Sequence, residues 1–149
     1  MNKDKTIDVL NELIEINNDR IEGYETATKE TEENELKTLF AGFIATSEKC
    51  KHELVLQVLK LEGTPEVGTR ITGKFFRVWM DVKAALTNKD RKAILNSCEY
   101  GEDVADETYR KALSDSGDIS SSTYEMIEAQ HILIKADHNR INILLEYLQ

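Results

Sequence analysis

The stretch GTPEVGTRITGKFFRVWMDVKAALTNKD, residues 63–90, decides the fold of this 149-residue chain. It lies between the second and third of four long helical patterns, and it is too long for a hairpin connection. Gly63 suits the position that follows the end of a helix, with Pro65 just beyond it. From about residue 70 to residue 86, aromatic and aliphatic side chains recur at helical spacing, so the connection contains a short helix.

Four long amphipathic helices flank this connection. Apolar side chains recur every three or four residues over about residues 4–31, 34–62, 91–114 and 122–148. Each helix would be roughly 36–43 Å long, so the four match well enough to lie side by side. A helical crossover lets the third long helix run parallel to the second, which is the connectivity of ferritin-like bundles. The predicted fold is all-α, without strands: one domain over residues 1–149, a ferritin-like four-helix bundle whose long crossover contains a short fifth helix.

Composition excludes several classes of function. A net charge of −9 argues against nucleic acid as a partner, because phosphate backbones require clustered Lys and Arg. Residues 1–5 carry no apolar segment and no run of 18 apolar residues exists, so we expect neither a signal peptide nor a membrane span. Cys50 and Cys98 lie on apolar faces without Cys-x-x-Cys spacing, which predicts buried free thiols in the cytoplasm. No nucleophile triad, phosphate loop or dinucleotide fingerprint indicates catalysis without a metal.

Polar residues that interrupt the apolar stripes are the candidates for a functional site. At ~1.5 Å per residue, five of them fall at one level, roughly 12–18 Å from one end of the bundle. They come from three of the four long helices: Glu22, Glu25, Glu99, Glu102 and His138. Carboxylates with few histidines suit a hard cation, so this layer predicts a site for one Fe, Mn or Zn ion.

Other interpretations of this layer stay open. At the same level the helix over residues 34–62 supplies Phe40 and Phe43, whereas a di-iron bundle takes carboxylates from all four helices. The glutamates also suit a solvated face, or a carboxylate–histidine or carboxylate–arginine network without metal. His131, which forms a Glu-x-x-His motif with Glu128, lies one heptad away from the layer and is more typical of a hydrogen-bonded core histidine.

Five stretches, in order along almost the whole chain, carry a family resemblance: LIEINND (13–19), GYE (23–25), WMDVKAAL (79–86), CEYGED (98–103) and HNRI (138–141). They resemble those of bacterial four-helix-bundle proteins of unknown function that are grouped with the ferritin-like superfamily. The resemblance implies the ferritin-like fold with a helical crossover, and it implies no activity. The ferritin pattern of two Glu-x-x-His motifs is absent, because the second long helix lacks one and Lys135 stands three residues before His138.

These observations lead to two hypotheses of function. We favour a non-catalytic helical-bundle protein that acts through its surface, as a stress-associated or oligomeric module, because the metal layer lacks ligands from one helix. The alternative is a metal-binding ferritin-like protein with redox activity on iron or oxygen. An acidic bundle with an exposed stripe is also suited to pairing as a homodimer.

Overall fold

The computed structural model describes residues 2–69, 73–115, 117 and 119–148, and within them the chain forms helices and no strand. The helices are α1 (Lys3–Glu30), α2 (Asn34–Lys60), α3 (Gly73–Thr87), α4 (Arg91–Ser114) and α5 (Ser121–Tyr147). The prediction of an all-α chain is confirmed. Residues 70–72, where the short crossover helix was predicted to begin, lie outside the described residues, as do the side chains up to residue 78. No helix in the described part combines the length and the apolar character needed to cross a membrane.

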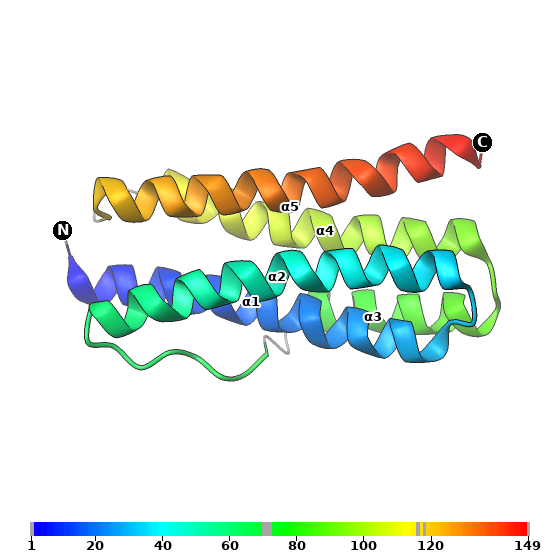
Figure 1. Cartoon of the computed structure of the whole chain (residues 1–149), viewed down its shortest axis with the longest axis horizontal. Helices are drawn as coiled ribbons and strands as arrows, with labels where there is room; N and C mark the ends of the chain where they lie inside the picture. The colour runs from blue at the N-terminus through cyan, green and yellow to red at the C-terminus, as the bar shows by residue number, and fades with distance from the viewer. Residues whose placement is uncertain (1, 70–72, 116, 118, 149) are drawn as a thin grey trace.

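Four long helices lie side by side along the long axis of the molecule (Figure 1). The most extensive contacts are those of α1 with α2 and of α4 with α5. The chain after α2 runs back along the molecule into α3, which packs against α4 and α1. As a result α2 and α4 run in the same direction (Figure 1).

Two apolar clusters fill the interior, one toward each end of the long helices. The first contains Phe40, Leu95 and Ile141, and the second contains Leu54 and Ile134; all five side chains are fully buried. Each such side chain contributes roughly 1.5–3 kcal/mol when it is removed from water. The clusters therefore hold the long helices in contact along their length, and they bracket a layer of polar side chains in the middle.

The end of α2 differs from the prediction. Glu62, and not Gly63, adopts the left-handed conformation, with φ of 64°. Gly63 follows it and donates its N–H to the carbonyl oxygen of Val58 at 2.9 Å. A Cβ at Gly63 would lie 2.9 Å from Cδ1 of Ile7, so close packing is what requires glycine there.

Candidate functional site

A polar layer lies between the two apolar clusters, and each long helix contributes one residue to it. The four residues are Arg20 of α1, Ser47 of α2, Glu102 of α4 and Asp137 of α5. The Arg20 and Glu102 side chains are each only 1% exposed, whereas Asp137 lies at the edge of the layer and is 16% exposed. Charged side chains are rarely buried to this extent unless they are paired. This layer is therefore the first candidate for a functional site.

The Arg20 guanidinium is the centre of the layer. Its Nε donates to Oε2 of Glu102 at 2.9 Å and its Nη2 to Oε1 at 2.5 Å, which is a bidentate pair. Its Nη1 donates to Oγ of Ser47 at 2.5 Å, and Nη2 also donates to Oδ2 of Asp137 at 3.0 Å. Burial alone would lower the pKa of Arg20, but the Glu102 carboxylate beside it outweighs that effect and holds the pKa above its usual range. The positive charge is thus permanent.

Tyr24 covers one side of this ion pair. Its hydroxyl donates to Oε1 of Glu102 at 3.1 Å, and Cζ of Arg20 lies 5.7 Å from the centroid of its ring. The ring stacks on Phe40, with centroids 5.4 Å apart, and meets Trp79 edge-on at 5.1 Å. Burial, and after it the nearby Glu102 carboxylate, raises the pKa of Tyr24 well above its usual value. The hydroxyl therefore stays protonated and keeps donating to Glu102.

A second set of hydrogen bonds joins all four long helices beside the first. Asn17 Nδ2 donates to the hydroxyl of Tyr109 at 2.8 Å, and that hydroxyl donates to Oε1 of Gln130 at 2.8 Å. Gln130 Nε2 in turn donates to the carbonyl oxygen of Cys50 at 3.2 Å and to Oε1 of Glu53 at 3.0 Å. Because these hydrogen bonds form one continuous series from α1 through α4 and α5 to α2, they fix the register of the helices.

Two His–Asp pairs connect α4 with α5. Nε2 of His131 lies 2.6 Å from Oδ1 of Asp106, and its ring stacks on Tyr109. Nε2 of His138 lies 2.6 Å from Oδ1 of Asp103. His131 thus has the hydrogen bond that the core-histidine interpretation expects, and His138 belongs to a carboxylate–histidine pair.

The five residues that the sequence placed in one metal layer differ in how deeply they are buried. Glu102 lies at the buried centre, whereas the Glu22 and Glu25 side chains are exposed to solvent. Glu99 and His138 are half-buried. Only Glu102 takes part in the central network.

The described residues do not fit a bundle metal centre. Both oxygens of Glu102 accept hydrogen bonds from Arg20, and one also accepts from Tyr24. Across the described part of the chain, no three His, Cys, Asp or Glu side chains are grouped closely enough to hold a metal ion. A fixed guanidinium charge would also repel a metal cation bound to the same carboxylate. The Fe, Mn or Zn site stays a prediction that only a binding measurement tests.

The sequence interpretation missed Arg20, Ser47 and Asp137. A signal for Arg20 was present, because it follows Asn17 by three residues and precedes Tyr24 by four on the buried stripe of α1. A basic residue on such a stripe needs a buried anion, and Glu102 supplies it. Ser47 carries no comparable signal, since small polar residues are common on helix faces.

The two cysteines are free and buried, as predicted. Burial raises the pKa of Cys50 to about 11. Burial, with the Glu102 carboxylate as a second cause, raises the pKa of Cys98 further. Since the thiolate is the reactive form, both residues are poor nucleophiles at neutral pH.

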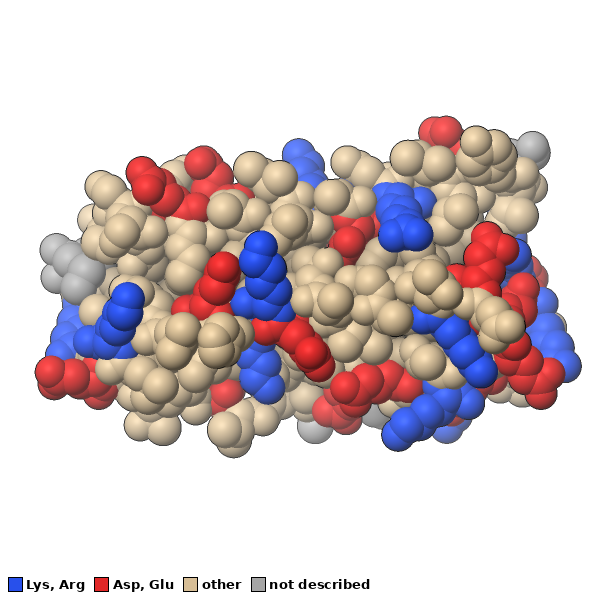
Figure 2. Space-filling model, in the orientation of Figure 1, with Lys and Arg blue, Asp and Glu red and all other residues tan. Residues whose placement is uncertain are grey.

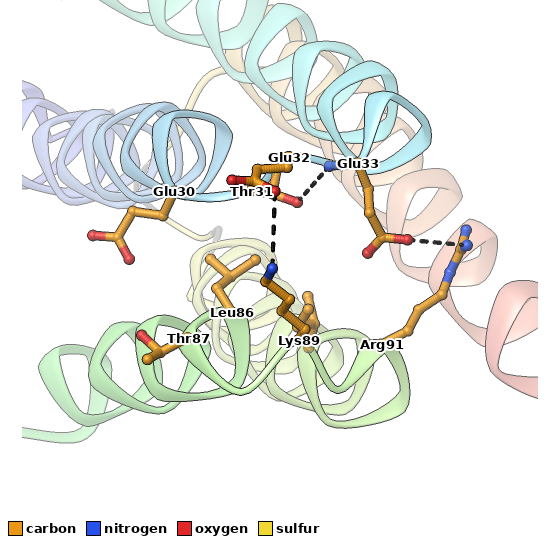
Figure 3. Close-up of a pocket in the computed structure, with 9 residues that line it drawn as sticks. Glu30, Thr31, Glu32, Glu33, Leu86, Thr87, Lys89 and Arg91 are labelled. Atoms are coloured by element: carbon orange, nitrogen blue, oxygen red, sulfur yellow. Dashed lines mark hydrogen bonds and ion pairs between the residues drawn. The ribbon is translucent and has the colours of Figure 1, made fainter.

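A cavity of about 350 Å³ lies at the end of the molecule where the α1–α2 and α3–α4 turns meet (Figure 3). Its acidic side chains are paired with basic ones. Glu32 lies 3.8 Å from Lys89 and Glu33 lies 3.6 Å from Arg91, as the dashed lines in Figure 3 mark. Charges that compensate one another in this way do not favour a charged ligand, and we do not assign the cavity a site.

Comparison with protein families identifies a related family. The model of a family described as "Domain of unknown function (DUF2383)" matches residues 5–115. The matched residues include Arg20, Ser47 and Glu102 and end before α5, which carries Asp137. No curated protein matches the chain.

Proposed function

The chain belongs to the DUF2383 family, and from this premise we propose that it is a non-catalytic, ferritin-like four-helix bundle that acts through its surface. The parallel directions of α2 and α4, with α3 in the connection between them, support the ferritin-like arrangement (Figure 1). The buried free thiols of Cys50 and Cys98 support a reducing compartment, the cytoplasm.

One observation carries the proposal: the chain's own guanidinium engages the carboxylate at the centre of the bundle. A metal ion bound to Glu102 would have to displace the N–H groups of Arg20 and the hydroxyl of Tyr24. It would also leave a permanently charged guanidinium buried without its anion, which is costly. The site is thus built as a structural ion pair, and their raised pKa values make Cys50 and Cys98 poor nucleophiles.

Metal binding tests this proposal. Protein purified without chelator would be analysed for metals and then titrated with Mn²⁺, Zn²⁺ and, without oxygen, Fe²⁺ in a calorimeter. We expect no stoichiometric uptake. Uptake of one ion per chain that is lost in Glu102→Gln, but retained in the exposed-residue control Glu48→Gln, would overturn it. Circular dichroism of both variants verifies that they are folded.

The second candidate function is metal binding at the α4–α5 seam. The observation that favours it is the half-buried His138, whose Nε2 lies 2.6 Å from Oδ1 of Asp103. An imidazole and a carboxylate are ligands that Zn²⁺, Fe²⁺ or Mn²⁺ accept, and water can complete the coordination. Uptake that is lost in His138→Ala and unaffected by Glu102→Gln would assign the metal to this seam and favour the alternative.

A further inference from the structure

Large apolar side chains are exposed on two neighbouring long helices. On α2 these are Leu56 and Leu59, which are 48% and 54% exposed. On α5 they are Ile132, Ile143 and Tyr147, which are 64%, 54% and 82% exposed. The two helices face the viewer in Figure 1, and Figure 2 shows much of this face in uncharged residues, with charges of both signs scattered over it.

The exposed side of α5 has the spacing of a helix-packing seam. Ala129, Ile132, Ala136, Asn139 and Ile143 follow one another at alternating intervals of three and four residues, and all five are exposed. That spacing repeats every seven residues and keeps one stripe in contact with a partner helix. Alanines within the stripe let a second helix approach closely. Since the opposite side of α5 is buried in the core, the helix has two packing faces.

The α2–α5 face also carries little net charge, so two copies of this chain can meet there without strong repulsion. The two helices carry six basic and seven acidic residues, whereas the rest of the chain carries 13 and 21. Their combined charge is therefore close to zero in a protein of net charge −9. Like charges brought together across an interface oppose association, and the near-neutral α2–α5 face avoids that cost.

We propose that the chain forms a homodimer in which α5 packs antiparallel on α5 of a second copy, about a two-fold axis level with Ile132. The charges of α5 suit this arrangement. Glu125 and Arg140 are equally far from the midpoint between Ile132 and Leu133, roughly 11 Å on either side. In the antiparallel pair each Glu125 is level with Arg140 of the other copy, so two ion pairs form. Ala129 becomes level with Ala136 of the other copy, where the helices come closest.

The same axis brings the two α2 helices together. The hydrogen bonds from Gln130 to Cys50 and from Gln57 to Thr123 set which residues of α2 and α5 are level, and they put Ile132 near the level of Glu48. A two-fold axis at that level brings Leu56 level with residue 40 of the other copy, next to the exposed Ala41. Two helices of ~40 Å, packed about 9 Å apart, offer roughly 700 Å² per copy, near the size of a standard interface.

The dimer proposal rests on the proposed surface function, and it identifies the partner as a second copy of the chain. Light scattering coupled to gel filtration, at about 1–100 µM protein, gives the mass. We expect twice the chain mass of 17.0 kDa. Ile132→Glu should weaken the dimer at least tenfold, or roughly 1.4 kcal/mol. The matched control Tyr100→Glu, at an apolar residue of α4 that is 51% exposed, should leave it intact.

A charge exchange tests the pairing itself. Glu125→Arg and Arg140→Glu should each weaken the dimer, and the double variant should recover it, because the opposite charges then face each other again. A wild-type monomer at every concentration, a dimeric Ile132→Glu variant, or a double variant no tighter than the single ones would each overturn the proposal. Metal uptake measured on the same samples tests the proposed function separately from the dimer. A dimer that binds metal through Glu102 would contradict the proposed structural ion pair and leave the dimer proposal intact.

Discussion

Arg20 and Glu102, 82 residues apart in the chain, form a buried bidentate ion pair that joins α1 to α4. Both side chains are buried away from solvent, so each member depends on the other for its stability. Ser47 and Asp137 extend it to α2 and α5. The same contact therefore holds the four long helices together and engages a carboxylate for which the sequence predicted a metal ion.

A double-mutant cycle tests how far the two members depend on each other. Arg20→Met leaves the Glu102 carboxylate buried without its counter-ion, and Glu102→Leu leaves Arg20 with only Asp137 at the edge of the layer. Each variant should therefore lower the free energy of unfolding by about 3–5 kcal/mol. The double variant replaces the pair with apolar groups and should lose much less than either single variant. Urea unfolding followed by circular dichroism measures all four proteins. If the double variant loses as much free energy of unfolding as the two single variants combined, the residues act independently.

Removal of the guanidinium alone should create a site for a free one. Arg20→Ala leaves Glu102, Asp137 and Ser47 around an empty space, and millimolar methylguanidinium should raise its melting temperature. A concentration ten times the dissociation constant adds about 1.4 kcal/mol. Wild-type protein and the variant Arg20→Ala with Glu102→Gln serve as controls and should not respond. Equal responses in all three proteins, or none in Arg20→Ala, would contradict a guanidinium-shaped site.

The helices could be predicted well because their signal is local. Apolar periodicity located all four long helices, and Asp90 caps the start of α4 by accepting the N–H of Ala93 with its side chain. The end of α2 could not be predicted from composition. Glycine is the usual left-handed residue, yet Gly63 is needed for its small size against Ile7, and Glu62 takes the strained conformation instead.

The site was predicted only in part, because height along a helix does not give the direction in which a residue points. Glu22 and Glu25 are level with Glu102, but successive residues turn by about 100° around the helix axis. Near that level it is the side chains of Arg20 and Tyr24 that are buried in the core. A rotational test on the stripe of α1 would have selected Arg20, whereas the contact with Ser47 depends on how α2 packs.

Alkaline pH should destabilise the protein through its buried thiols. The folded-state pKa values of Cys50 and Cys98 lie above those of the unfolded chain, so the unfolded chain loses these protons first as the pH rises. The free energy of unfolding should therefore be maintained below about pH 8 and fall between about pH 9 and 11, by up to ~1.4 kcal/mol per pH unit for each thiol. Urea midpoints across this range measure it. A variant with both cysteines changed to Ala should decline less steeply, and an unchanged slope would exclude the thiols as the cause.

Replacement of two helical glycines by alanine should change the stability of the protein in opposite directions. A Cβ at Gly23 would lie 2.2 Å from Cε2 of Trp79, so Gly23→Ala must displace the indole that packs on Tyr24, at a cost of roughly 1–3 kcal/mol. At Gly42 the nearest atom is the Nη1 of Arg140 at 3.9 Å, and Gly42→Ala should gain about 0.5–1 kcal/mol from helix propensity alone. Thermal unfolding and tryptophan fluorescence compare the two variants. Because Trp79 is the only tryptophan, its emission should shift in Gly23→Ala and stay constant in Gly42→Ala. An unshifted, fully stable Gly23→Ala variant would mean that α3 does not pack on α1 at this glycine.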